Sequence, residues 1–210
     1  MKRKTKSYDG SRPISTGALT RVIGGFLLDN ESQNFVEGDV IPAGTLARRD
    51  EATRKVSIVK TGKIVNIDVS NKKIITLESD AFLSPIFAIG DKVLKTVSGT
   101  YADAPTVEKI SNTDSGYVIT LSGEISGLAA GDILQEVVKN ENDAVALKAN
   151  CVVVSDTSVR DNGETIVDVC VDTMQWAIYE RRILPVVSAQ KSADNFHLAE
   201  NPHIRFTFQE

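Results

Sequence analysis

Short apolar runs separated by turn-forming residues recur along the chain from residue 21 to its end. Residues 55–60 and 165–171 are two such runs, rich in the β-branched residues that favour strands. Ile204, Phe206 and Phe208 alternate with polar residues, which is the two-residue period of a half-buried strand. With turns every ~8–12 residues, this pattern favours short-stranded β-barrel or sandwich domains. We therefore predict a mostly β fold.

One segment departs from this pattern. Residues 188–200 contain no strand-like run and are the best candidate for a helix, although their apolar residues are poorly spaced for one.

The middle of the chain contains a duplicated hairpin unit, in residues 63–94 and 108–134. Each copy begins as a hairpin around a polar turn, passes through an Ile-Thr-Leu sequence, and ends in a Gly-Asp turn and a short strand. The matching segments are Ile75–Leu77 with Ile119–Leu121 and Gly90-Asp91 with Gly131-Asp132. An internal repeat is the signature of a scaffold. We expect the copies to superpose, with Ile75 and Ile119 at equivalent core positions.

Composition divides the chain into three parts. Residues 1–20 are polar and basic, and they contain too few apolar side chains to form a core, so we expect an extended N-terminal arm. Residues 21–138 are expected to form a β domain that contains the two related units. Residues 139–210 are expected to form a C-terminal β region.

Charge and apolar content exclude several classes of protein. The formal net charge is −4, which disfavours a dedicated nucleic-acid binder. No apolar run approaches the ~20 residues of a membrane helix, and the basic start is not followed by the apolar segment of a secretory signal. We expect a soluble protein made in a reducing cytoplasm, where Cys151 and Cys170 are buried free thiols. A disulfide between them remains the alternative if residues 161–163 form a hairpin turn.

No motif indicates catalysis, a metal or a cofactor. His197 and His203 do not have the spacing of a zinc site, and neither Gly-Asp turn continues into a calcium-binding loop. Gly24 and Gly25 belong to no phosphate-binding motif. We therefore expect no catalytic residue, no metal site and no cofactor, and the chain is not expected to be an enzyme.

Residues 38–60, GDVIPAGTLARRDEATRKVSIVK, resemble the start of tailed-bacteriophage capsid decoration and head fibre proteins. The matching positions are Ile41–Leu46, the acidic turn at 50–53 and the strand at 56–59. The two Gly-Asp turns, at 88–94 and 130–134, are also similar to turns of phage virion proteins. The resemblance implies a β-rich protein on the outside of a phage head, often trimeric, with an N-terminal arm that lies on the shell.

On this resemblance we expect a structural virion protein that is made in the host cytoplasm and located on the capsid surface. Its partners are expected to be the major capsid protein and further copies of the chain, as a homotrimer. The basic cluster and two isolated apolar residues of the arm are the candidate capsid contacts: Lys2, Arg3, Lys4, Lys6, Ile14 and Leu19. The C-terminal strand supplies the candidate contacts between subunits: Ile204, Phe206 and Phe208.

A carbohydrate- or cell-surface-binding β-module of a phage or bacterium is the alternative function. Four scattered aromatic residues could stack on sugar rings: Tyr101, Tyr117, Trp176 and Tyr179. Only 6% of the residues are aromatic, and they do not cluster in the sequence, which weakens this alternative.

Overall fold

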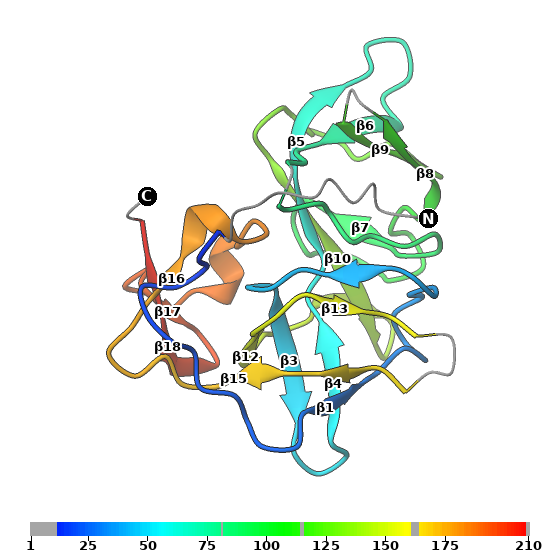
Figure 1. Ribbon diagram of the computed structural model, residues 1–210. Helices are drawn as coiled ribbons and strands as arrows, with labels where there is room; N and C mark the ends of the chain where they lie inside the picture. The colour runs from blue at the N-terminus through cyan, green and yellow to red at the C-terminus, as the bar shows by residue number, and fades with distance from the viewer. Residues whose placement is uncertain (1–11, 81, 114–115, 161–163, 209–210) are drawn as a thin grey trace. The chain divides into compact units, whose positions relative to one another are not determined.

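The computed structural model describes residues 12–80, 82–113, 116–160 and 164–208 (Figure 1). Over these ranges the chain forms eighteen short strands and two 3-10 helices of three residues each. The fold is thus mostly β, as the sequence predicts.

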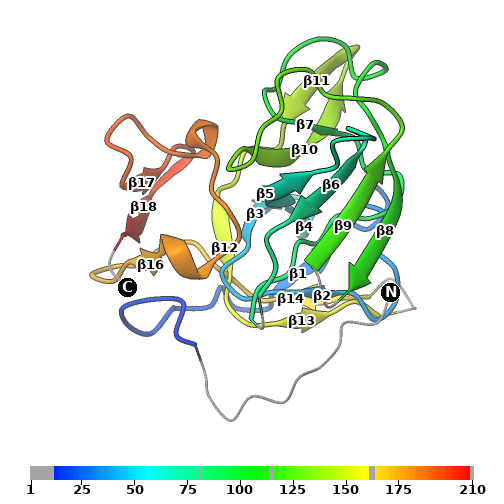
Figure 2. The same ribbon diagram turned by 90° about the horizontal axis from the view of Figure 1, so that it is seen from above.

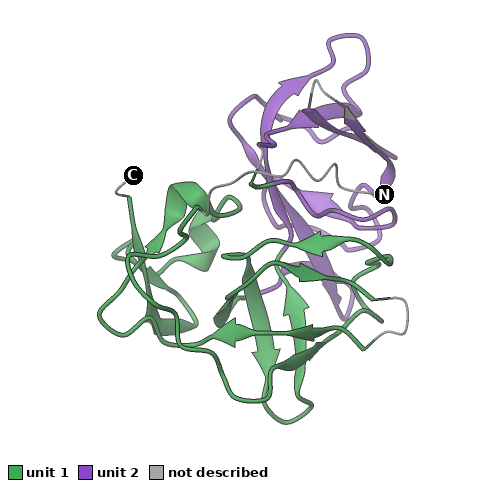
Figure 3. Ribbon diagram, viewed as in Figure 1, with its two compact units in different colours: residues 1–59, 81–83, 148–210 green, residues 60–80, 84–147 purple. Residues whose placement is uncertain are grey.

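The chain folds into two compact units (Figure 3). Unit 1 comprises residues 1–59, 81–83 and 148–210, and unit 2 comprises residues 60–80 and 84–147. This differs from the expected boundary at residue 138, because a strand at 46–50 pairs with one at 151–153 and so joins two distant parts of the sequence. Unit 2 is therefore an insertion between the two halves of unit 1.

A six-stranded sheet with the order β14-β1-β4-β3-β12-β15 forms the body of unit 1. Only β1 and β4 run parallel; the other neighbours are antiparallel. Its side chains supply much of the core of this unit, with Phe26, Ile58 and Val152 almost fully buried. The strands are β1 (Phe26–Leu28), β3 (Leu46–Asp50), β4 (Lys55–Ile58), β12 (Cys151–Val153), β14 (Ile166–Val167) and β15 (Val169–Cys170).

Two smaller sheets complete unit 1. β2 (Val40–Ile41) pairs with β13 (Thr157–Ser158), and the third sheet has the order β16-β18-β17. Its strands and the two 3-10 helices are β16 (Ile178–Tyr179), η1 (Glu180–Arg182), η2 (Ser188–Gln190), β17 (His197–Leu198) and β18 (Asn201–Thr207).

The helix predicted at 188–200 is wrong. Only Ser188–Gln190 is helical, as one 3-10 turn, and the chain then reverses into β17. The reversal is built around Asp194, whose carboxylate accepts hydrogen bonds from the N–H groups of Phe196 and His197. Aspartate favours turns for this reason, and the pairing of β17 with β18 holds the reversed chain in place.

Unit 2 is a curled, nearly closed sheet of seven strands (Figure 2). The order is β11-β10-β5-β6-β9-β8, and β7 pairs with β10. A bridge between Lys92 and Thr106 links the start of β7 to the start of β8. The strands are β5 (Thr61–Ile67), β6 (Ile74–Leu77), β7 (Val93–Leu94), β8 (Val107–Thr113), β9 (Gly116–Leu121), β10 (Ile133–Asn140) and β11 (Asp143–Ala146).

The predicted duplication is present in unit 2. The hairpins β5–β6 and β8–β9 lie beside each other in the sheet. In both hairpins the register shifts directly after the first residue pair, in β5 and in β8. These first pairs are Ile64 with Leu77 and Val107 with Leu121. Ile75 and Ile119 occupy equivalent positions, face each other across β6 and β9, and are both fully buried.

The two Gly-Asp turns are equivalent in their hydrogen bonds as well. The carboxylate of Asp91 accepts from the N–H of Ala88, and that of Asp132 accepts from the N–H of Ala129. Both glycines have positive φ, 100° at Gly90 and 92° at Gly131. The C=O of each aspartate accepts from the first strand of the other copy, at Val107 and Ile64. The turn of each copy is thus hydrogen-bonded to the first strand of the other copy, so the two copies form one folded unit.

Cys151 and Cys170 are free and buried on the neighbouring strands β12 and β15. The Cys151 thiol donates to the C=O of Ala47, and the Cys170 thiol donates to the C=O of Asp172. Burial raises the pKa of Cys151 to about 12, so the thiol stays protonated at neutral pH. The expected hairpin turn at 161–163 lies outside the described residues.

Candidate functional site

Residues 12–19, called the arm segment below, lie along the free edge of β16 in unit 1. Ser15 forms an antiparallel bridge with Ile178. The N–H of Thr16 donates to the C=O of Ala177 at 2.9 Å, and the N–H of Tyr179 donates to the C=O of Ile14 at 2.8 Å. This part of the predicted arm is thus ordered by its own chain.

Two glycines allow close packing around the arm segment. A Cβ on Gly17 would lie 2.2 Å from the ring of Trp176, so the backbone of the arm segment rests on the indole. Gly44, in the Pro-Ala-Gly-Thr turn, packs against Ile183 and lies near Ile14. Its φ of 85° is in the left-handed region that favours glycine.

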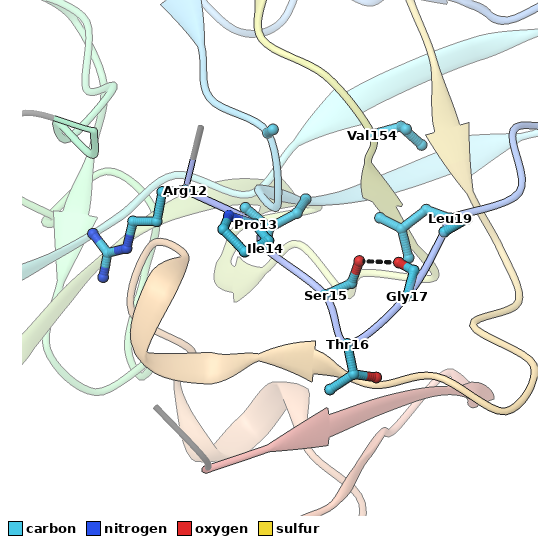
Figure 4. Close-up of a pocket in the computed structure, with 10 residues that line it drawn as sticks. Arg12, Pro13, Ile14, Ser15, Thr16, Gly17, Leu19 and Val154 are labelled. Carbon is cyan, nitrogen blue, oxygen red and sulfur yellow. Dashed lines mark hydrogen bonds between the residues drawn. The ribbon is translucent and has the colours of Figure 1, made fainter. Parts of the chain in front are cut away.

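A cavity of about 570 Å³ opens beside the arm segment (Figure 4). Ala43, from the same turn as Gly44, and Val154 contribute to its wall, together with residues 12–19. Thr16 points away from Val154, and the hydroxyl of Ser15 donates to the C=O of Gly17 (Figure 4). The volume is within the ~300–1,000 Å³ range typical of ligand-binding clefts.

Arginine side chains join the arm segment to η1. Arg12 donates to the C=O of Arg181, and Arg182 donates to the C=O of Pro13, both at 3.1 Å. The Arg182 guanidinium also stacks on the ring of Tyr179, 4.2 Å from its centroid. These contacts make one side of the site basic, which favours an acidic partner surface.

The site contains only part of the predicted capsid contacts. Ile14 and Leu19 both line the cavity, half-buried, on the same short segment. The basic residues Lys2, Arg3, Lys4 and Lys6 lie outside the described residues. Arg181 and Arg182 were not predicted as site residues, and Trp176 was named only as a candidate for stacking on sugars, because only the three-dimensional pairing of the arm segment with β16 brings these residues together.

The predicted subunit contacts have different surroundings within the chain. Ile204 and Phe206 are buried in unit 1, and β18 is paired on both sides, by β16 and β17. Phe208 is 45% exposed and meets the half-exposed ring of Phe196 edge-to-face at a centroid distance of 6.1 Å. Of the three residues, only Phe208 has a large exposed apolar surface.

The aromatic residues of the carbohydrate-binding alternative do not form a platform. Tyr117 is buried and donates to the C=O of Phe87. Tyr101 is covered by the Lys92 ammonium, 5.0 Å from its ring centroid, and Tyr179 by Arg182. Trp176 alone is substantially exposed, at 42%.

A second cavity, of about 330 Å³, also lies in unit 1. Its amide side chains are engaged by backbone: Asn150 exchanges two hydrogen bonds with Arg49, and Asn201 donates to the C=O groups of Asn150 and Val171. These contacts hold separate chain segments together, which is a structural role.

A cluster of buried charged side chains lies in unit 2, and no pattern in the sequence indicated it. Lys60, which immediately precedes β5, lies 2.8 Å from Asp91 and 3.5 Å from Glu136. Lys60 and Asp91 have fully buried side chains, and that of Glu136 is 7% exposed. The three side chains therefore belong to the interior of unit 2.

One turn brings together serine, aspartate and histidine. Asp194 pairs with His197 Nδ1 at 2.6 Å and accepts a hydrogen bond from Ser192 Oγ. The hydrogen bond from Ser192, with those from backbone and His197, holds the pKa of Asp194 far below its usual range. The serine hydroxyl bonds to the Asp194 carboxylate and to the backbone C=O of His197, and not to the imidazole, so this is not the order of a nucleophilic triad.

Among the described residues, no group of three or more His, Cys, Asp or Glu side chains is arranged to hold a metal ion. None of the helices in the described ranges is long and apolar enough to cross a membrane.

No family model, no curated protein and no solved structure matches the chain.

Proposed function

We propose that the chain is a structural virion protein that binds the outside of a bacteriophage capsid through the arm segment and the cavity beside it. One observation carries this proposal. Ala43, from the Pro-Ala-Gly-Thr turn that resembles phage decoration proteins, lines the same cavity as the predicted contacts Ile14 and Leu19. Two features that are separate in the sequence thus belong to one surface site.

The chemistry of the site suits a shell protein as partner. The site offers exposed backbone, two half-buried aliphatic side chains and neighbouring arginines, which together can bind an extended segment of another protein. The affinity of a single copy for the shell is modest on this proposal. Many copies on one particle compensate for a modest contact through avidity. The proposed partner is the major capsid protein, and the proposed location is the capsid surface.

The homotrimer is part of the same proposal, with Phe208 and its partner Phe196 as the contact between subunits. Both rings are nearly half exposed, and exposed aromatic pairs are typical of protein interfaces. Light scattering of the purified chain measures this state; a monomer at high concentration would remove the trimer from the proposal and leave the shell contact to be judged separately.

We expect the double variant Ile14→Asp, Leu19→Asp to lose about tenfold or more in binding to capsids that lack this protein, because charges replace two apolar side chains that line the cavity. Co-sedimentation with such capsids measures the occupancy. Ile23→Asp is the matched control, since Ile23 is 94% exposed in the same unit and its change should leave occupancy within about twofold.

Circular dichroism of both variants checks that the body remains folded. The shell contact is wrong if the folded double variant occupies capsids as well as the wild type does. If electron microscopy and mass analysis find the protein in no virion, the whole proposal fails.

A further inference from the structure

The buried cluster of unit 2, Lys60, Asp91 and Glu136, joins three parts of the sheet. Lys60 precedes β5, Asp91 lies in the turn before β7, and Glu136 is on β10. The Lys60 ammonium donates to both carboxylate oxygens of Asp91, at 2.9 and 2.8 Å. The N–H of Glu136 donates to the C=O of Lys60 at 3.0 Å, so backbone and side chains hold the same junction.

The charges of the cluster do not balance if all three groups ionise. Lys60 and Asp91 neutralise each other, and a second carboxylate adds one uncompensated negative charge to an environment nearly closed to water. An isolated buried charge is so costly that the group instead changes its protonation state. One of the two carboxylates is therefore expected to hold a proton.

The hydrogen bonds identify which carboxylate is protonated. Asp91 accepts two bonds from Lys60 and one from the N–H of Ala88, all of which favour its charged form. Glu136 Oε1 is 3.5 Å from Lys60, and Oε2 is buried with no hydrogen-bond partner in the described structure. The proton therefore belongs on Glu136.

The duplication contains an internal comparison. Asp132 is the counterpart of Asp91, and the residue four positions after Asp91 is Lys95, whereas four positions after Asp132 is Glu136. Lys95 pairs with Asp132 at 2.8 Å, and both side chains are partly exposed. The second turn thus has a balanced pair near solvent. Only the first turn combines two carboxylates with one buried cation.

The described groups on the β7 side of Glu136 do not restore the charge balance. On the β7 side, the Lys92 ammonium donates to the C=O groups of Tyr101, Ala102 and Ala104. The Tyr101 hydroxyl is neutral, and burial, aided by Glu136 and Asp91, raises its pKa further. Burial, reinforced by Asp91 and opposed by Lys60, raises the pKa of Glu136 to about 8.

We propose that Glu136 is a proton-dependent clamp of unit 2: it holds a proton while β10, β7 and the start of β5 are packed together, and its deprotonation loosens this junction. The inference is independent of the proposed capsid function, because unit 1 contains every residue of the capsid site.

The sign of the pH effect follows from the two protonation states. In the unfolded chain the carboxyl titrates near its ordinary pKa of 4.5, whereas in the folded chain its pKa is about 8. Between these values the folded chain binds a proton that the unfolded chain has lost. The contribution of protonated Glu136 to the stability of the folded chain is therefore complete below about pH 4.5, falls as the pH rises, and is fully lost above about pH 8.

The test compares thermal unfolding of the full chain and of Glu136→Gln between pH 5.5 and 8.5. Glutamine has the shape and neutral charge of the protonated side chain. We expect the wild-type Tm of unit 2 to fall by about 10 °C over this range, and that of the variant by about 2 °C or less. Glu108→Gln is the control, because Glu108 is exposed on β8 of the same unit and should leave the wild-type pH dependence unchanged.

A carboxyl-detected NMR titration of the wild type gives a second test that needs no variant. A Glu136 resonance that titrates near pH 8 supports the clamp, even if Glu136→Gln does not fold. A resonance that titrates near 4.5, or equal pH dependence of Tm in wild type and Glu136→Gln, overturns it.

Discussion

Lys60→Met is expected to lower the free energy of unfolding of unit 2 by about 3–5 kcal/mol. The methionine fills a similar volume but removes the only cation of the buried cluster, so Asp91 loses two hydrogen bonds of 2.8 and 2.9 Å. A buried carboxylate without a cation is far less stable than a buried pair. Removing one partner therefore costs much more than the pair itself contributes.

Chemical denaturation followed by circular dichroism measures this loss. Lys63→Met is the matched control on β5, because Lys63 and its partner Glu78 are about half exposed and such a pair contributes about 0–1 kcal/mol. Equal stabilities of the two variants would show that the Lys60–Asp91 pair does not hold unit 2 together. Adding Asp91→Asn to Lys60→Met should restore part of the loss, since it removes the orphaned charge.

Sequence reasoning could not find this cluster for a physical reason. Asp91 is in a Gly-Asp turn, and turn formation alone accounts for an aspartate there; the structure shows that its carboxylate both caps the turn and accepts from Lys60. Lys60 ends a strand-like run, where a lysine is normally exposed. Only the curling of the sheet brings residues 31 positions apart into contact.

Local features were predictable and long-range ones were not. The two hairpins and their Gly-Asp turns depend on residues close in sequence, and they form as predicted. The boundary between the units depends on the pairing of β3 with β12, about a hundred residues apart, which no local pattern reveals. For the same reason, the alternation at 204–208 predicted a strand but not that β16 and β17 flank it.

The candidate site shows the same division. Ile14 and Leu19 stood out as isolated apolar residues in a polar segment, and the structure places both on one cavity. The surface that receives the segment comes from residues 176–183, more than 150 positions away in the sequence, and had no pattern to indicate it.

Gly44→Ala is expected to destabilise unit 1 by about 2–5 kcal/mol, from backbone strain and overpacking together. The φ of 85° costs any residue with a Cβ about 1–2 kcal/mol. The new methyl group would also lie 2.2 Å from Cγ2 and 3.2 Å from Cβ of Ile183, which is only 4% exposed and cannot move into solvent. Ile14 lies 3.7 Å from the same position, so the arm segment should shift as well.

Gly38→Ala separates the two contributions. Gly38 has nearly the same φ, 86°, but a Cβ there would meet nothing within 4 Å. It should therefore lose only the about 1–2 kcal/mol of backbone strain. Trp176, the only tryptophan of the chain, lies under Gly17 and reports on the arm segment by its fluorescence. We expect its emission to shift to longer wavelength in Gly44→Ala and to stay unchanged in Gly38→Ala. Equal losses of stability with unchanged emission in both variants would mean that Ile183 and the arm segment accommodate the methyl group, and that the Pro-Ala-Gly-Thr turn does not position the cavity.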